Sequence, residues 1–308
     1  MKALVFGSLN IDFVYQVPRF VQAGETLASS DLARYCGGKG LNQAVALSRA
    51  GVETWMAGAV GAEGGLLLDT LRDAGVNTEL VAACREPTGH AIIQNTPDGD
   101  NCILIFGGAN RSISSEQVEK TLARFDSGDF LLVQNEINQL PLILRRAKEK
   151  GMNTVLNPSP MEVELIRELL PYTDILILNR GEGCELLGTD ALEPENLATE
   201  LWVRYPHITV VLTLGVQGAV LTKNGEILIQ PAFSVPAVDT TGAGDTFTGY
   251  FLSAMMEDDD AAKALEFAAA AAALTVTRPG AAPSIPSRLE TEQFMLQYSK
   301  EKQLDGNR

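Results

Sequence analysis

The sequence predicts an α/β fold in which a mostly parallel central sheet has helices on both faces, with a small β-sheet lid beside it. Three observations indicate this fold. From residue 115 onward, short apolar runs alternate with helical segments, which is typical of a Rossmann-like parallel sheet. Two stretches nearer the N-terminus alternate polar and apolar residues, as half-buried strands do. The chain has 308 residues, 45% of them hydrophobic, enough for a large buried core.

The main sheet is expected to begin with Leu4–Phe6, an apolar run that ends at a glycine and is typical of a buried strand. Glycines at positions 51, 75 and 151 stop three of the expected helices. The other expected strands are 54–59, 130–133, 153–156, 174–178 and 208–213. The expected helices are 42–50, 66–73, 115–125, 140–150, 242–257 and 261–276.

The lid is expected to come from two insertions, about residues 11–36 and 88–106, forming a small antiparallel sheet within a single α/β domain, 1–308. Segments 90–94 and 102–106 have period 2, and the turn between them, Thr96–Asp100, contains Pro, Asp and Gly. These residues are typical of hairpin turns. Because one face of such a lid would be exposed, the sequence predicts a homodimer that pairs two lids.

The net charge of −15, from 24 basic and 39 acidic residues, excludes a nucleic-acid-binding protein, which needs a basic face to neutralise phosphates. The chain has no apolar run of about 18 residues, the length that a membrane span needs. Its N-terminus does not have the features of a signal peptide, so a cytoplasmic location is expected. Four separated cysteines and two histidines indicate neither a zinc site nor a disulfide framework.

The segment Asp239–Phe247 is the most informative for chemistry. Gly242 and Gly244 let the backbone turn tightly just where a helix starts. The free N–H groups of a helix's first turn, with its positive dipole end, attract phosphate. Asp245 follows them and can accept a proton from an alcohol. The segment is neither a Walker loop nor a dinucleotide fingerprint, because Phe247 stands where the third glycine is needed.

This segment resembles the C-terminal signature of the ribokinase-like carbohydrate kinases, and Gly37–Ala44 resembles their N-terminal signature. The resemblance covers nearly the whole chain. Further matching segments are 7–12, 108–110, 157–160, 213–218 and 277–284. The resemblance implies a ribokinase-like fold and ATP-dependent phosphorylation of D-ribose to D-ribose 5-phosphate.

The resemblance also implies roles for particular residues. Asp245 would be the catalytic base, and the amides of Gly242, Ala243 and Gly244 would form an anion hole. Buried sugar hydroxyls need donors and acceptors on several sides, and Asn, Asp and Lys supply that mixture. The positions matched to the sugar are Asn10, Asp12, Gly38, Lys39, Gly40, Asn42, Glu136 and Asp245.

For the nucleotide, the family's Asn-x-x-Glu motif implies that Asn179 and Glu182 hold phosphate and hydrated Mg²⁺. The sequence departs from the family at two positions. Arg180 places a positive charge near the phosphate path, where the family usually has an acidic residue, and Ala269 replaces a side chain that is often polar and near the purine. The positions matched to ATP are Asn179, Glu182, Thr213, Leu214, Gly215, Val216, Gln217, Gly218, Gly244 and Ala269.

The resemblance further implies a monovalent-cation site built mostly from backbone carbonyls. Carbonyl oxygens with one carboxylate suit a large, weakly hydrated ion such as K⁺. The alternative is a pair of structural loops with no ion. The matched positions are Asp239, Thr241, Thr275, Arg278, Gly280 and Ser284.

Two alternatives to ribose phosphorylation remain at the level of sequence. Related kinases act on deoxyribose, fructose or nucleosides with the same two signatures, and they differ in the lid and the sugar pocket. A catalytically silent sugar-binding regulator on this fold is the other alternative. Such a protein is expected to have lost the base or the anion-hole glycines, whereas Asp245, Gly242 and Gly244 are all present.

Overall fold

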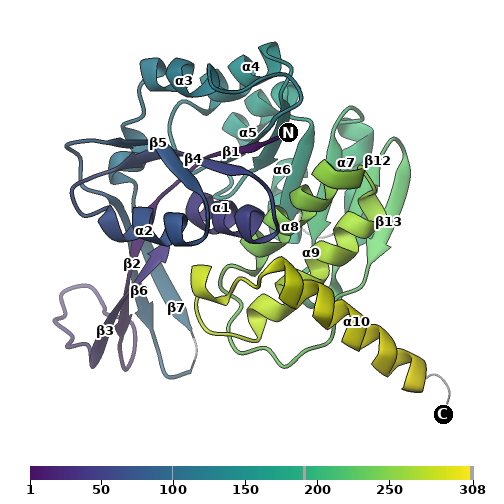
Figure 1. Ribbon diagram of the computed structural model, residues 1–308. Helices are drawn as coiled ribbons and strands as arrows, with labels where there is room; N and C mark the ends of the chain where they lie inside the picture. The colour runs from purple at the N-terminus through teal and green to yellow at the C-terminus, as the bar shows by residue number, and fades with distance from the viewer. Residues whose placement is uncertain (99, 190–191, 306–308) are drawn as a thin grey trace.

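The computed structural model describes residues 1–98, 100–189 and 192–305. Within them lie a nine-stranded sheet, in the order β13-β12-β11-β10-β9-β8-β1-β4-β5, and a separate four-stranded sheet, in the order β3-β2-β6-β7. Figure 1 shows the smaller sheet as a lid at the lower left, below the main body. None of the helices in the described ranges combines the length and apolar character needed to cross a membrane.

The main sheet is parallel from β11 to β5 in the order above, as predicted. Its inner strands are buried on both faces, as is typical of parallel sheets covered by helices. Strands β12 and β13 add an antiparallel edge. The strands are β1 (Ala3–Phe6), β4 (Thr54–Val60), β5 (Asn77–Ala83), β8 (Phe130–Gln134), β9 (Asn153–Asn157), β10 (Ile175–Asn179), β11 (Thr209–Thr213), β12 (Ala219–Lys223) and β13 (Glu226–Gln230).

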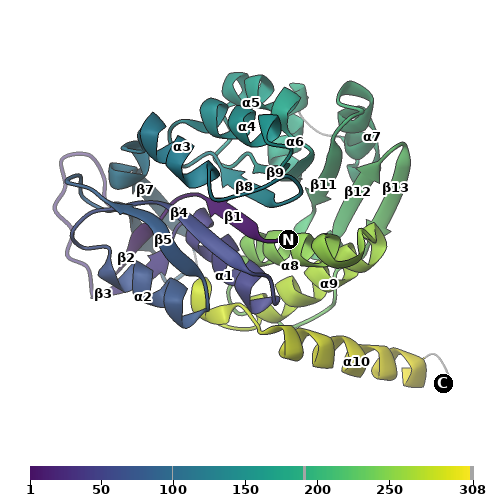
Figure 2. The same ribbon diagram turned by 45° about the horizontal axis from the view of Figure 1, so that its top comes forward.

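Helices cover both faces of this sheet, with one apolar core on each side. Figure 2 shows α3 to α7 above the sheet and α1, α8 and α9 below it. The helices are α1 (Lys39–Arg49), α2 (Gly65–Asp73), α3 (Ser115–Leu122), α4 (Leu140–Glu149), α5 (Val163–Leu169), α6 (Arg180–Leu187), α7 (Pro194–Arg204), α8 (Ala243–Asp258), α9 (Ala261–Val276) and α10 (Arg288–Asp305).

Helices α1 and α8 pack unusually closely. A Cβ atom added at Gly249 of α8 would lie only 2.5 Å from the Cβ of Ala46 in α1, so any larger side chain would push the helices apart. This contact brings the first turns of the two helices together. Those turns carry the residues that the sequence assigns to the sugar and to catalysis.

The lid consists of β2 (Asn10–Gln16), β3 (Asp31–Gly37), β6 (Gly89–Asn95) and β7 (Asn101–Phe106). The hairpin of β6 and β7 is antiparallel, as predicted; Gly99, in the turn between them, lies outside the described residues. The prediction of a wholly antiparallel lid is wrong, because β2 and β6 pair in parallel. The long connection through the main sheet lets both strands run in the same direction.

Candidate active site

The predicted site residues gather at the carboxyl edge of the parallel strands. Asn179 ends β10, Thr213 ends β11, and the loop after β8 carries Glu136. The chain after β1 leads directly to Asn10 at the start of β2. Ligands of open α/β sheets bind outside this edge, so the arrangement has the position of an active site.

The Asp245 carboxylate is held by two side-chain amides from the first turn of α1. The Asn42 Nδ2 atom donates to Oδ2 of Asp245 at 2.9 Å, and the Gln43 Nε2 atom donates to Oδ1 at 2.9 Å. Asp245 is buried, with 8% of its surface exposed. The predicted base and one predicted sugar residue, Asn42, are therefore in direct contact.

Gly242 directly precedes α8 as its N-cap, and its φ of 76° is in the left-handed region that favours glycine. Space is also limited there, since an added Cβ would lie 3.1 Å from the Cα of Ala281. At Gly244, by contrast, an added Cβ would meet nothing within 4 Å. The first N–H groups of a helix have no intrahelical partner, so this open side of the turn can receive an anion.

On the sugar side, Glu136 joins the turn after β1 to the start of α1. Its carboxylate accepts hydrogen bonds from the Ser8 hydroxyl and, at 3.2 Å, from the backbone N–H of Lys39. Gly38, which directly precedes α1, has a φ of 93°, and an added Cβ would lie 2.9 Å from the Ser8 carbonyl oxygen. This position therefore requires glycine. The next glycine, Gly40, is buried, and its N–H donates to the Ser8 hydroxyl at 3.3 Å.

Lys39 lies among carboxylates. Burial alone would lower the pKa of its ammonium group, but the nearby carboxylates of Asp245 and Glu136 outweigh this effect and raise the pKa above the ordinary value. Lys39 is therefore a fixed positive charge between the predicted base and the predicted sugar residues.

Asn10 is oriented by Asn110, which donates to its Oδ1 atom at 2.7 Å and is itself bonded to the backbone of Leu9. An added Cβ at Gly89 would lie 2.2 Å from Asn110 and 2.4 Å from Asn10. Both amides are buried, so this contact fixes which face Asn10 presents to a ligand.

Asp12 follows on β2 and has a perturbed carboxyl group. Burial, and secondarily the charge of Glu136, raise its pKa to about 7. A Cβ at Gly37 on the paired strand would lie 2.1 Å from the Asp12 carboxylate, which shows how closely the backbone encloses this group.

Replacing Asp12 with Asn is expected to stabilise the ligand-free protein above pH 7. The Asp12 pKa is raised from 3.8 to about 7 on folding, so the stability associated with its proton is fully present below about pH 4 and is lost progressively as the pH rises from there through 7. Asn stays neutral and avoids this loss, worth about 1–3 kcal/mol at pH 8. Denaturant unfolding of Asp12→Asn and of wild type, at pH 5 and at pH 8, measures the difference in their unfolding free energies.

The matched control is Asp98→Asn, an exposed carboxylate in the lid turn, which is expected to change stability at neither pH. An advantage of Asp12→Asn that is the same at pH 5 and pH 8 would contradict the assignment of the titration to Asp12.

Asn179 and Glu182 form a reciprocal cap at the start of α6. The Glu182 N–H donates to Asn179 Oδ1 at 2.9 Å, and the Asn179 N–H donates to Glu182 Oε2 at 2.9 Å. The intervening Arg180 turns its guanidinium to the carbonyl oxygen of Leu192, at 2.9 Å. That contact directs the charge of Arg180 toward the α6–α7 connection.

The predicted nucleotide loop connects β11 to β12. Gly215–Gln217 form a single 3₁₀ turn, closed by a hydrogen bond of 2.8 Å from the Leu214 N–H to the Gly218 carbonyl oxygen. Val216 at its tip is 96% exposed, which is unusual for an apolar side chain. Ala269 lies apart from this loop in sequence, in α9, and is buried.

Asp239 joins the two loops of the predicted cation site. Its Oδ1 atom accepts from the N–H and hydroxyl of Thr241, at 2.9 and 2.7 Å, and its Oδ2 atom accepts from the Gly280 N–H at 2.8 Å. Burial would raise the Asp239 pKa, but these bonds outweigh it and hold the pKa below its ordinary value. Thr275, in the last turn of α9, and Ser284, in the second loop, are buried.

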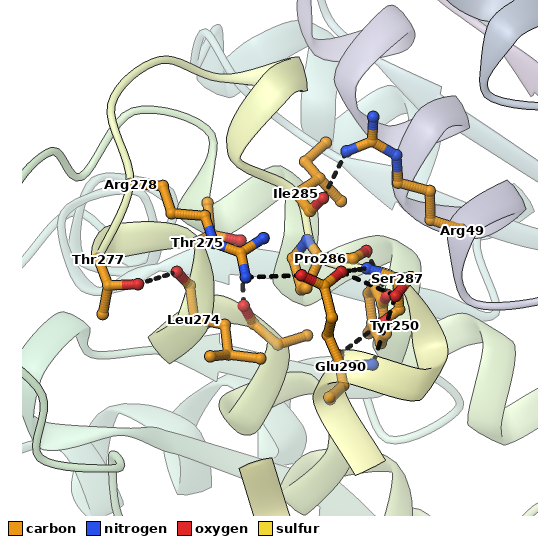
Figure 3. Close-up of polar contacts among 12 residues, drawn as sticks. Arg49, Tyr250, Leu274, Thr275, Thr277, Arg278, Ile285, Pro286, Ser287 and Glu290 are labelled. Carbon is orange, nitrogen blue, oxygen red and sulfur yellow. Dashed lines mark hydrogen bonds and ion pairs between the residues drawn. The ribbon is translucent and has the colours of Figure 1, made fainter. Parts of the chain in front are cut away.

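Figure 3 shows the surroundings of this second loop. The Arg278 side chain pairs with Glu290 at 2.8 Å, so it is available to a cation site only through its backbone. Arg49, in the last turn of α1, donates to the carbonyl oxygens of Ala282, at 3.0 Å, and Ile285. The loop is thereby connected to α1, the helix whose side chains Asn42 and Gln43 hydrogen-bond to Asp245.

Three residues near the site were missed at the level of sequence: Ser8, Gln43 and Asn110. Ser8 and Asn110 lie in segments that match the family, and Gln43 follows Asn42 in the N-terminal signature. Their place in short matching segments was the signal that could have pointed to Ser8 and Asn110, whereas Gln43 gave no separate signal. Their contacts became visible only with the tertiary structure.

Residues 1–288 match the model of the pfkB family carbohydrate kinases. The chain belongs to this family. The family and the fold predicted from the sequence are therefore confirmed.

The pfkB family relatives are similar along nearly the whole chain. Ribokinase of Haemophilus influenzae is 36% identical over 298 residues, covering 94% of this chain and 97% of the relative. Deoxyribokinase of Salmonella typhi is 31% identical over 304 residues, covering 96% and 97%. The structure of Arabidopsis thaliana ribokinase complexed with ribose and ATP has a TM-score of 0.85 at 32% identity, covering 95% and 98% of the two chains.

Proposed function

We propose that this enzyme transfers the γ-phosphoryl group of ATP to D-ribose, giving D-ribose 5-phosphate and ADP. The observation that carries the proposal is the Asp245 carboxylate, held by two amides of α1, beside the open first turn of α8. The similarity to ribokinases, one of them solved with ribose and ATP, supports ribose as the acceptor.

In the proposed reaction, the Asp245 carboxylate accepts the proton of the attacking sugar hydroxyl. The hydroxyl oxygen bonds to the γ-phosphorus as the bond between that phosphorus and the β–γ bridging oxygen breaks, and ADP leaves. Charge on the transferring group is stabilised by the amides of Gly242, Ala243 and Gly244 at the positive end of α8. Phosphoryl transfer requires mainly such positioning and charge stabilisation.

The sugar is proposed to lie between β2 and the start of α1. Asp12 and Glu136 supply acceptors, and Lys39 supplies donors. The amides of Asn10 and Asn42 can supply both, with Oδ1 of Asn10 already bonded to Asn110 and Nδ2 of Asn42 to Asp245. The backbone at Gly38 and Gly40 leaves room for the ring. The support is their common position around the Glu136 and Asp245 carboxylates.

ATP is proposed to lie across the ends of β10 and β11, with its base near the 213–218 loop and Ala269. The capping Glu182 is one carboxylate beside a phosphate path, and Mg²⁺ is usually held by one or two carboxylates with phosphates and waters. The residues therefore fit an ion bound through Glu182 and water, and Mg²⁺ would neutralise charge on the phosphates. A cytoplasmic location, where ATP is supplied, is part of the proposal.

The decisive test is ATP consumption by the purified protein across pentoses, hexoses, nucleosides and phosphosugars. D-ribose is expected to give the highest kcat/KM. A higher value with deoxyribose would instead favour the activity named for the Salmonella relative, and turnover with none of the sugars would contradict a kinase. The panel is measured with and without K⁺.

K⁺ is expected to raise the rate several-fold over Na⁺ at fixed Mg²⁺ and ionic strength. The proposed ion would lie between the loop of Asp239 and the segment from Thr275 to Ser284, where one carboxylate and several carbonyls would suit a large cation. It would stiffen the loop that leads into Gly242. Asp239→Asn is expected to remove most of the response to K⁺. Equal wild-type rates in the two salts would contradict the cation site.

The protein is expected to be a homodimer joined through the lid. The outer strand β7 exposes a run of apolar side chains, and exposed apolar patches of this kind mark interaction sites. Leu104→Lys in β7 is expected to give monomers by light scattering at micromolar concentration. Val203→Lys on α7 is the control, because Val203 is similarly exposed, at 60% against 67% for Leu104. A monomeric wild type would contradict the pairing.

A further inference from the structure

A chain of buried side-chain amides lies behind the Asp245 carboxylate. Gln134, the last residue of β8, donates through Nε2 to Oε1 of Gln43 at 2.6 Å. Gln43 donates through Nε2 to Asp245, at 2.9 Å, and to Oδ1 of Asn157, at 3.2 Å. Gln43 and Gln134 have 0% of their surface exposed.

These contacts allow Gln43 only one orientation. Its NH₂ group faces two acceptors, and its oxygen faces the donor on Gln134. Rotation of the amide by 180° would place the Gln43 oxygen against the Asp245 carboxylate and leave buried groups unpaired, which is costly. Asn157 is fixed in turn, because its Nδ2 atom donates to the Ile177 carbonyl oxygen at 2.9 Å.

The backbone is shaped to leave room for this chain. A Cβ atom added at Gly7 would lie 2.1 Å from Oε1 of Gln134. Gly7 begins the turn that leads from β1 toward the sugar residues, so the same turn leads to the sugar site and admits the Gln134 side chain.

The two amides on Asp245 have different surroundings. Asn42, which binds Oδ2, is one of the proposed sugar ligands, so its hydrogen bonds are open to change when a sugar binds. Gln43, which binds Oδ1, is fully enclosed by β8, β9 and α8. Its bond to Asp245 is the one that can persist through the reaction.

We propose that Gln43, kept in one orientation by Gln134, is the positioning residue that directs the Asp245 carboxylate toward the sugar hydroxyl. The inference rests on the proposed function, in which Asp245 is the base. Gln134 acts through Gln43 and does not touch the base itself.

The test uses Gln43→Met and Gln134→Met in the full-length protein, since Met keeps nearly the same volume without polar atoms. Gln43→Met is expected to lower kcat about 10-fold while KM for ribose changes less than about 2-fold, since a positioned base contributes to kcat. A carboxylate that loses a donor holds its proton to higher pH, so the acidic limb of the kcat profile is expected to move upward.

Gln134→Met is expected to lower kcat less than Gln43→Met and to move the acidic limb in the same direction. The double variant should match Gln43→Met alone, because residues that act through one another are not additive. Asn153→Leu, at the opposite end of β9, is the control: its amide bonds the Gly128 carbonyl oxygen, and its loss should leave the acidic limb unmoved.

Failure of this inference is distinct from failure of the proposed function. If wild type does not consume ATP in the presence of any sugar, the proposed function is overturned. If wild type is active but Gln43→Met keeps its kcat and its acidic limb, the positioning role is overturned. Fully additive effects of the two substitutions would overturn the role of Gln134.

Discussion

Asp245→Asn is expected to lower kcat on the order of 10²- to 10⁴-fold, the usual contribution of a positioned proton acceptor. The amide cannot take the proton of the sugar hydroxyl. It also presents an NH₂ group to either Asn42 or Gln43, whose donors both point at the present carboxylate. One unpaired buried donor costs about 1–3 kcal/mol, so the unfolding free energy should fall as well. Steady-state kinetics and denaturant unfolding measure the two effects.

Ribose binding, measured by calorimetry, separates the two consequences of Asp245→Asn. A folded variant that still binds ribose but does not turn over assigns the loss to chemistry. Asp258→Asn, at the other end of α8 and exposed to solvent, is the matched control and should keep wild-type kinetics. Near-normal turnover of Asp245→Asn would remove Asp245 from its role as base.

Gly244→Val is expected to lower kcat by on the order of 10²-fold, comparable to the loss of an oxyanion-hole donor. An added Cβ at this position meets no protein atom within 4 Å, so the folded protein has room for the side chain. The space it fills is where the transferring phosphoryl group is proposed to approach the amides of α8. The variant should therefore fold normally and lose turnover.

The control for Gly244→Val is Gly65→Val, which shares its geometry. Gly65 is also an exposed glycine in the first turn of a helix, and an added Cβ there again meets nothing within 4 Å. Both variants are expected to unfold at nearly the same temperature, whereas only Gly244→Val loses activity. Equal activities of the two variants would show that the α8 turn does not approach the phosphoryl group.

Local sequence patterns predicted most of the parallel strands and six of the helices, because apolar runs and helix-stopping glycines are local signals. Strand β5 and helices α5, α6, α7 and α10 were missed. The antiparallel edge of β12 and β13 was missed, although Asn224 and Gly225 between them both have positive φ and form a strong hairpin signal. The parallel pairing of β2 with β6 could not be predicted, since it joins segments far apart in the chain and no local pattern specifies that register.

The same contrast holds for the site. The glycines and Asp245 could be found because their spacing has its own chemical meaning at a helix start. Gln43 could not be found in this way, because a glutamine in a helix is ordinarily a solvent-facing residue. Only the approach of β8 and α8 to α1 turns it into a buried contact of the base.

The reciprocal cap of Asn179 and Glu182 has a consequence for how such chains change over evolution. The pair holds the first turn of α6 whether or not a nucleotide ever binds, and losing a cap typically costs about 1 kcal/mol. A descendant that abandoned phosphorylation would still gain by keeping both side chains. The presence of Asn179 and Glu182 therefore says little about whether a related protein is catalytically active. Loss of activity would show first as substitution of the glycines at the start of α8.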